Sequence, residues 1–269
     1  MNNLVVRALT GAVFVAILLG AFYLGSIATF FLFGIVVILG LSEFYQLFQH
    51  HTSIQPCRWT GIIGGTLLYV VLLYPYLFHQ IASFRLAAIP IVALTFIIEL
   101  YRNKTSPIAN LGVLLLGWLY IISPFYLAVI ITMLGGEMGS YVLMSLFIIV
   151  WTNDTFAYLT GRFFGKRKLF ERISPKKTWE GTLGGISFAL IAGVLVASFL
   201  GMDMIFWLIG AFLIAVTSIY GDLFESLLKR SVGVKDSGNI LPGHGGILDR
   251  FDAVIYAIPF FYVWLIIYN

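Results

Sequence analysis

Residues 107–134 read PIANLGVLLLGWLYIISPFYLAVIITML, a long stretch without a charged side chain. About 20 consecutive apolar residues are enough to cross the hydrocarbon core of a bilayer as a helix. The rest of the chain is similar, because 60% of its 269 residues are hydrophobic and only 10% are charged. Soluble domains carry about 25% charged residues. The sequence therefore predicts an all-α integral membrane protein.

Apolar runs of this kind recur along the chain and predict nine membrane-spanning helices. They lie at about 4–24, 27–47, 59–79, 82–100, 107–134, 140–161, 178–200, 203–226 and 251–268. These runs are continuous rather than alternating, which argues against a β-barrel.

The basic residues predict how the helices are oriented. If the nine spans alternate across the bilayer, Arg85 alone among the 16 Lys and Arg residues falls on one side. Basic residues concentrate on the cytoplasmic side of membrane proteins. We therefore expect a multi-pass protein of the cell membrane with a cytoplasmic N-terminus and an external C-terminus. The net charge of +4 then reflects topology, and no nucleic-acid partner is predicted.

Polar residues divide the chain into two parts of one membrane domain. Residues 1–150 are predicted to be a hydrophobic scaffold, and residues 151–269 to be catalytic helices with a cytoplasmic site. Glu43 and Glu99 lie near cytoplasmic helix ends and are interpreted as interfacial carboxylates. Two glycine pairs with four-residue spacing predict close helix packing: Gly61 with Gly65, and Gly181 with Gly185.

Five carboxylates of the second part are expected at the cytoplasmic ends of three helices: Asp154, Asp222, Glu225, Asp249 and Asp252. At 1.5 Å per residue, Asp154 and Asp222 lie about 10–12 Å inside their helix ends, where a charge needs a cavity and a partner. Such oxygen ligands suit Mg²⁺. Asp222 and Asp249 are the favoured metal ligands, and the other three are further candidates. The alternative is that the carboxylates pair with their basic neighbours: Lys229, Arg230 and Arg250.

A glycine-rich loop, LPGHGGILDRFDA at 241–253, comes just before the last apolar run. Its glycines Gly243, Gly245 and Gly246 allow backbone amides to approach an anion beside a helix start. His244 is interpreted as a phosphate donor, a general acid, or a residue that holds the loop by hydrogen bonds. The cations of this region are Lys229, Arg230, Lys235 and Arg250. Together these groups predict a metal-dependent phosphoryl- or nucleotidyl-transfer site at headgroup depth, although the chain has no P-loop motif.

Residues 226–252 resemble the C-terminal signature of the phosphatidate cytidylyltransferases, or CDP-diacylglycerol synthases. The matching positions are Ser226, Lys229, Arg230, Lys235, Asp236, Gly238, Pro242, Gly243, His244, Gly245, Gly246, Asp249, Arg250 and Asp252. Three further segments are similar to the family: NDTFAYLTGR at 153–162, SPKKTWEG at 174–181 and GDLFES at 221–226.

The resemblance implies that CTP and phosphatidic acid give CDP-diacylglycerol and pyrophosphate, for phospholipid biosynthesis. It also implies a requirement for Mg²⁺, a second, monovalent cation such as K⁺, and a homodimer in the lipid membrane. By matching position, Asp222 and Asp249 would hold metal. The phosphate-binding residues would be Lys176, Lys177, Lys229, Arg230, Lys235 and Arg250.

Two other functions remain open from the residues alone. A CTP-dependent lipid or polyprenol kinase would use similar cations but would attack the γ-phosphate. A secondary transporter would use intramembrane carboxylates to couple ions to substrate movement, although the carboxylates here gather at one membrane face.

Overall fold

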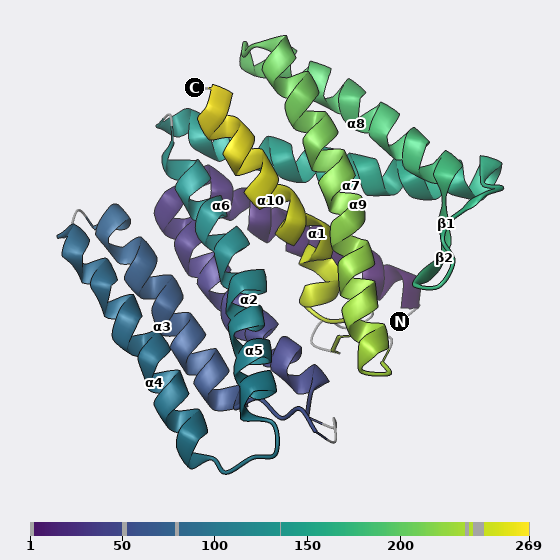
Figure 1. Cartoon of the computed structure of the whole chain (residues 1–269). Helices are drawn as coiled ribbons and strands as arrows, with labels where there is room; N and C mark the ends of the chain where they lie inside the picture. Colours follow the sequence, from purple (N-terminus) through teal and green to yellow (C-terminus); the bar gives the residue numbers. More distant parts are fainter. Residues whose placement is uncertain are drawn as a thin grey trace.

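A computed structural model describes residues 3–49, 53–78, 81–134, 136–234, 237–238 and 245–268 of the chain. Within these ranges helices dominate (Figure 1). The α-helices are α1 (Asn3–Tyr23), α2 (Ser26–Leu47), α3 (Arg58–Leu77), α4 (Ala88–Tyr101), α5 (Pro107–Gly117), α6 (Ser123–Met133), α7 (Glu137–Phe164), α8 (Trp179–Leu200), α9 (Met204–Ser231) and α10 (Leu248–Tyr268). A 3₁₀ turn, η1 (Ala82–Ala87), precedes α4, and a π-helical turn, η2 (Trp118–Ile122), joins α5 to α6.

Eight helical segments of the described chain are long and apolar enough to cross a membrane. They cover Ser26–Leu47, Arg58–Leu77, Ala82–Tyr101, Pro107–Met133, Met138–Phe164, Trp179–Leu200, Met204–Ser231 and Leu248–Tyr268. Each coincides with a predicted run, and α1 contributes a shorter apolar segment, Leu9–Tyr23. The prediction of a helical, multi-pass membrane protein is confirmed. The total of nine spans and their orientation stay predictions.

A β-hairpin between α7 and α8 corrects the prediction that the chain is all-α. Strands β1 (Lys168–Phe170) and β2 (Ser174–Thr178) pair antiparallel, and Figure 1 places them at the shared end of α7 and α8. The segment is too rich in charge to continue a membrane helix, and Pro175 disfavours a helix at Ser174. Thr178 ends the hairpin and caps α8, because its hydroxyl accepts a hydrogen bond from the Gly181 amide at 3.2 Å.

Phenylalanine rings from both parts of the chain form one core. Phe22 of α1, Phe33 of α2, Phe125 of α6, Phe147 of α7 and Phe251 of α10 are all at most 1% exposed. Ring centroids are 5.1 Å apart for Phe22 and Phe147, and 5.2 Å apart for Phe125 and Phe251. Edge-to-face and tilted contacts at these distances are favourable. Helix α10 is therefore held against helices of the first 150 residues, and this contact positions its N-terminal end.

Both predicted glycine pairs lie at close helix contacts, as expected. A Cβ atom on Gly65 would lie 2.6 Å from Leu41 Cδ1, and one on Gly61 would overlap the Tyr45 ring. On α8, a Cβ on Gly181 would lie 2.7 Å from the Ala157 carbonyl oxygen, and one on Gly185 2.8 Å from that of Asn153. The small residues let α3 approach α2, and α8 approach α7, at a distance that a side chain would prevent.

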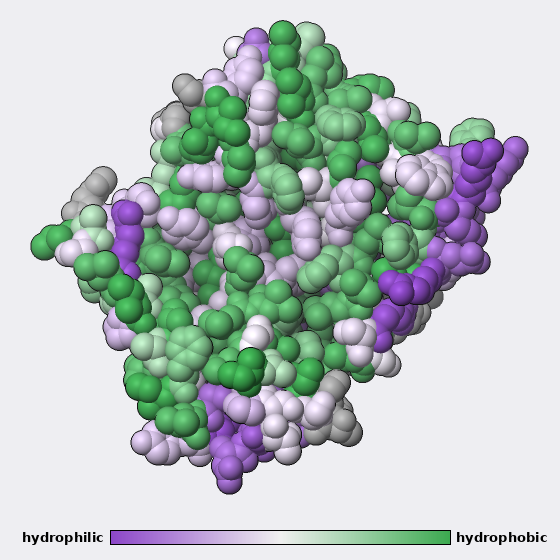
Figure 2. Space-filling model, viewed as in Figure 1, coloured by the Kyte–Doolittle hydropathy of each residue, from purple (hydrophilic) through white to green (hydrophobic). Residues whose placement is uncertain are grey.

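The outer surface has the polarity expected of a membrane protein. Figure 2 shows hydrophobic side chains over most of the visible face and hydrophilic ones gathered along its right and lower edges. Large apolar side chains such as Leu195 and Phe199 of α8 are 64% and 87% exposed. Exposed apolar area of this extent indicates contact with lipid rather than water.

Candidate active site

Lys229 lies at the centre of a charged group between α9 and α10. Its Nζ is 3.1 Å from Glu225 Oε2, one turn earlier on α9, and 2.6 Å from Asp249 Oδ1 on the first turn of α10. The three side chains, here called the Lys229 cluster, are 13%, 2% and 12% exposed. A cation between two nearly buried carboxylates offsets the cost of removing them from water. The pairing of carboxylates with Lys229, one of the two predicted alternatives, is therefore present.

The second oxygen of Asp249 binds the chain that leads into α10. Oδ2 accepts hydrogen bonds from the Gly246 amide at 2.8 Å, the Ser237 hydroxyl at 3.0 Å and the Ser237 amide at 3.3 Å. Gly245 has a φ of +82°, a conformation that favours glycine, and a Cβ there would lie 2.8 Å from Oδ2. The Gly246 amide is thus already used within the chain, because the Asp249 carboxylate reaches back to it. Its binding of phosphate, and that of Gly245, stay predictions.

Asp222 pairs with Lys177 of the hairpin. Lys177 Nζ lies 2.5 Å from Asp222 Oδ2, and the Ser226 hydroxyl donates to Oδ1 at 3.4 Å. The Lys177 and Asp222 side chains are 25% and 38% exposed, so water screens this pair more than the Lys229 cluster. The hairpin therefore carries one of the predicted phosphate-binding lysines to the predicted metal ligand.

The remaining predicted carboxylates border these two pairs. Asp252 lies beside Glu225 and interacts electrostatically with Asp222. Asp154 of α7 interacts electrostatically with Asp252, Lys177 and Asp222. Three helices thus bring the five carboxylates to one region. Among the described residues, no group of three or more His, Cys, Asp or Glu side chains is already arranged to hold a metal ion.

The other predicted site residues are exposed or not described. Lys176, Arg230 and Arg250 are exposed, and Arg230 Nη1 donates to the Val234 carbonyl at 3.2 Å. Lys235, Gly243 and His244 lie outside the described residues, so their roles stay predictions.

Glu43 of α2 is a site residue that the sequence reasoning missed. It is 1% exposed, and it accepts hydrogen bonds from the backbone amides of Ile247 at 2.9 Å and Leu248 at 3.0 Å. Its interpretation as an interfacial carboxylate is wrong, because the amides at the start of α10 provide partners inside the protein. The available signal was that Glu43 is the only charged residue of the run 27–47.

Glu99 of α4 is also buried, at 4% exposure, so the same interpretation is wrong there. Asn110 Nδ2 donates to its Oε1 at 2.7 Å and Arg102 Nη1 to its Oε2 at 2.5 Å. Arg102 Nη2 also donates to the Gln55 carbonyl at 2.9 Å. This network ties the turn between α4 and α5 to the segment before α3, and none of its members belongs to the Lys229 cluster.

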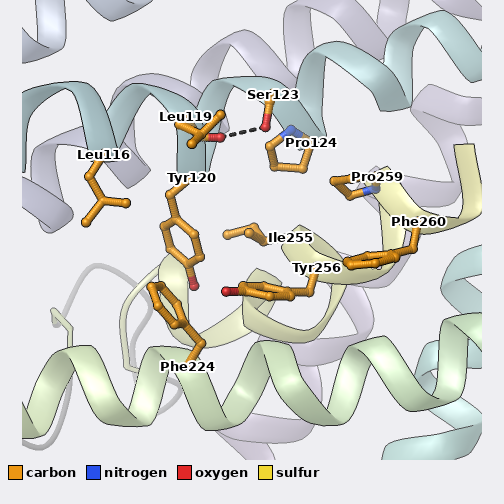
Figure 3. Close-up of a pocket in the computed structure, with 10 residues that line it drawn as sticks. All are labelled: Leu116, Leu119, Tyr120, Ser123, Pro124, Phe224, Ile255, Tyr256, Pro259 and Phe260. Atoms are coloured by element: carbon orange, nitrogen blue, oxygen red, sulfur yellow. Dashed lines mark hydrogen bonds between the residues drawn. The ribbon is translucent and has the colours of Figure 1, made fainter. Parts of the chain in front are cut away.

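An apolar pocket of about 190 Å³ lies between the α5–η2–α6 span, α9 and α10 (Figure 3). The lining residues are Leu116, Leu119, Tyr120, Ser123, Pro124, Phe224, Ile255, Tyr256, Pro259 and Phe260. Figure 3 shows the Tyr120 and Tyr256 hydroxyls pointing toward one another across it. We call it the Tyr120 pocket.

The Tyr120 pocket adjoins the carboxylates. Tyr120 interacts electrostatically with Glu225 and Asp252, and its buried hydroxyl has no hydrogen-bond partner among the described residues. A second apolar pocket, of about 320 Å³, shares Phe224 and Tyr256 with it and extends to the hairpin. Charged groups and apolar pockets therefore meet at the cytoplasmic half of α9 and α10 that the sequence predicts.

Comparison with known proteins agrees with this arrangement. A sequence model described as "Cytidylyltransferase family" matches residues 5–268. A phosphatidate cytidylyltransferase of Bacillus subtilis is 37% identical over 215 residues, which cover 78% of this chain and 79% of the relative. One of Staphylococcus haemolyticus is 30% identical over 276 residues, covering 97% and 98%. One of Haemophilus influenzae is 43% identical over 130 residues, covering 46% and 45%. With a match over nearly its whole length, the chain belongs to the cytidylyltransferase family.

Proposed function

We propose that this chain transfers the cytidylyl group of CTP to phosphatidate and so makes CDP-diacylglycerol for phospholipid synthesis. A phosphate oxygen of the lipid forms a bond to the α-phosphorus of CTP, the bond from that phosphorus to the bridging oxygen of the β-phosphate breaks, and pyrophosphate leaves. The observation that carries the proposal is the junction of lysine–carboxylate pairs with apolar pockets, in a chain of this family. The pairs suit phosphates and the pockets suit a lipid.

The reaction needs no general base on the protein. A phosphate monoester has a second pKa near 6 and is largely dianionic at neutral pH, so the nucleophile is already ionised. The barrier lies in bringing two polyanions together, which cations lower by stabilising the charge. Lys177 and Lys229 are placed for this task, because each already binds carboxylate oxygens at 2.5–3.1 Å. Lys176, Arg230, Lys235 and Arg250 are the further proposed phosphate ligands.

The oxygen donors fit a hard divalent cation, and we assign Mg²⁺ to them. Glu225 Oε1 is buried without a hydrogen-bond partner among the described residues, beside Asp252 and near Asp222. Asp222 and Asp249 would hold the ion, and Asp154, Glu225 and Asp252 are further ligands. Binding through Asp249 Oδ1 would displace Lys229, which then becomes available to a phosphate. When bound, Mg²⁺ neutralises the triphosphate and polarises its phosphoryl oxygens. A monovalent cation such as K⁺ is the proposed second ion.

The apolar pockets support a lipid as the second substrate. The Tyr120 pocket has an almost wholly hydrocarbon wall and ends at two tyrosine hydroxyls near the carboxylates. An acyl chain fits such a wall, and its ester oxygens suit hydroxyl donors. In the cell membrane, a site at the cytoplasmic ends of α9 and α10 would receive CTP from the cytoplasm and phosphatidate from the leaflet. We also propose that the protein is a homodimer in the bilayer.

CTP labelled separately at the α- and γ-phosphates tests the proposal. The purified protein is incubated with phosphatidate and Mg²⁺, and the lipid product is examined for label. Label from the α-position, with release of pyrophosphate, is expected. Label from the γ-position would show a lipid kinase instead, and an unlabelled lipid with both substrates intact would contradict transfer altogether.

A further inference from the structure

Glu43 reaches the site from the opposite half of the chain. It lies near the end of α2, is 1% exposed, and has hydrogen-bond donors on both carboxylate oxygens. Oε1 accepts from the Ile247 amide at 2.9 Å, and Oε2 accepts from the Leu248 amide at 3.0 Å and the Ser237 hydroxyl at 3.3 Å. The first amides of a helix have no partners within the helix and carry partial positive charge. A buried carboxylate satisfies both needs at the start of α10.

Two glycines make room for this carboxylate. A Cβ on Gly238 would lie 2.7 Å from Glu43 Oε1, and one on Gly246 would lie 2.5 Å from Oε2 and overlap the Ser237 hydroxyl. Side chains at either position would displace the carboxylate or the backbone that it binds. The chain on both sides of residues 239–244 is thus packed directly against Glu43.

Ser237 links Glu43 to Asp249. Its hydroxyl lies 3.3 Å from Glu43 Oε2 and 3.0 Å from Asp249 Oδ2, and its single proton serves one carboxylate at a time. Gly246, which touches Glu43, donates its amide to the same Asp249 oxygen. The orientation of Asp249 toward Lys229 therefore depends on backbone that Glu43 holds.

We propose that Glu43 is a positioning residue, which clamps the entry of α10 so that Asp249 stays in the Lys229 cluster. The inference that it affects turnover rests on the proposed function, whereas the clamp itself does not. Nothing in α2 touches the apolar pockets or the Lys177 pair, so Glu43 acts through Asp249 and its backbone.

Hydrogen exchange in the substrate-free protein tests the clamp without the reaction. Glu43→Gln keeps the shape but replaces one acceptor oxygen with an amide group that donates, so one of the two α10 amides loses its partner. We expect the amides of Ile247 and Leu248 to exchange about tenfold faster or more. Glu99→Gln is the matched control, because Glu99 is an equally buried carboxylate in another network, and it should leave these amides unchanged. Unaltered exchange at both amides in Glu43→Gln would overturn the clamp.

Steady-state kinetics test the consequence. A misplaced catalytic group lowers the rate by about tenfold to a hundredfold, so Glu43→Gln should lower kcat to that extent with KM for CTP changed little. Glu43→Asp keeps the charge and should recover part of the rate. If Glu43→Gln speeds exchange but leaves kcat at the wild-type value, the clamp stands and its role in positioning Asp249 is refuted. If the wild type has no cytidylyltransferase activity at all, the proposed function fails and the exchange result is unaffected.

Discussion

Replacing Lys229 with methionine should destabilise the protein strongly, and the structure indicates why. Asp249 would keep its donors from Ser237 and Gly246. Glu225 would lose the partner of Oε2, and its Oε1 has none among the described residues, at 2% side-chain exposure. Removing one member of a buried ion pair costs about 3–5 kcal/mol, because the other charge is left uncompensated. We expect Lys229→Met to lower the free energy of unfolding by about that amount.

Lys177→Met is the matched control for this substitution. Lys177 and Asp222 are 25% and 38% exposed, and pairs screened by water contribute at most about 1 kcal/mol. Reversible unfolding in mixed detergent micelles, followed by circular dichroism, measures both variants against the wild type. The double variant Glu225→Gln with Lys229→Met removes the isolated charge and should regain most of the lost stability. Equal stabilities for the two lysine variants, or no recovery in the double variant, would refute the reasoning.

Four other outcomes are expected. Gly61→Leu should lower the free energy of unfolding by about 1–3 kcal/mol in the same assay, because its side chain would enter the Tyr45 ring; Gly20→Leu, where nothing lies within 4 Å, is its control. Gly246→Ala should reduce kcat at unchanged expression, since its Cβ meets Glu43. Chelation of Mg²⁺ should abolish CDP-diacylglycerol formation, and excess Mg²⁺ should restore it. Hydrogen bonds from the Phe206 amide and the Tyr268 hydroxyl lower the pKa of Asp203, so the melting temperature lost in Asp203→Ala should be seen at pH 7 and should vanish as the pH falls below about 3.9.

Membrane spans and signature residues were predictable because both are local. Each span depends on the hydropathy of its own residues, so 107–134 or 203–226 could be recognised without knowing any neighbour. The hairpin at 168–178 was missed for the same reason, because its charged residues mark only the end of a helix. Which strand pairing follows depends on how close α7 and α8 approach.

The sequence by itself determined a helical membrane protein whose carboxylates and lysines gather in its second part. Only the tertiary structure decided that Lys229 binds Glu225 and Asp249, that Asp222 binds Lys177, and that Glu43 binds the start of α10. Glu43 and Ile247 are 204 residues apart, and no local pattern predicts a contact at that separation. Hydropathy acts on each helix alone, whereas these pairs form only after the helices have packed and excluded water between them.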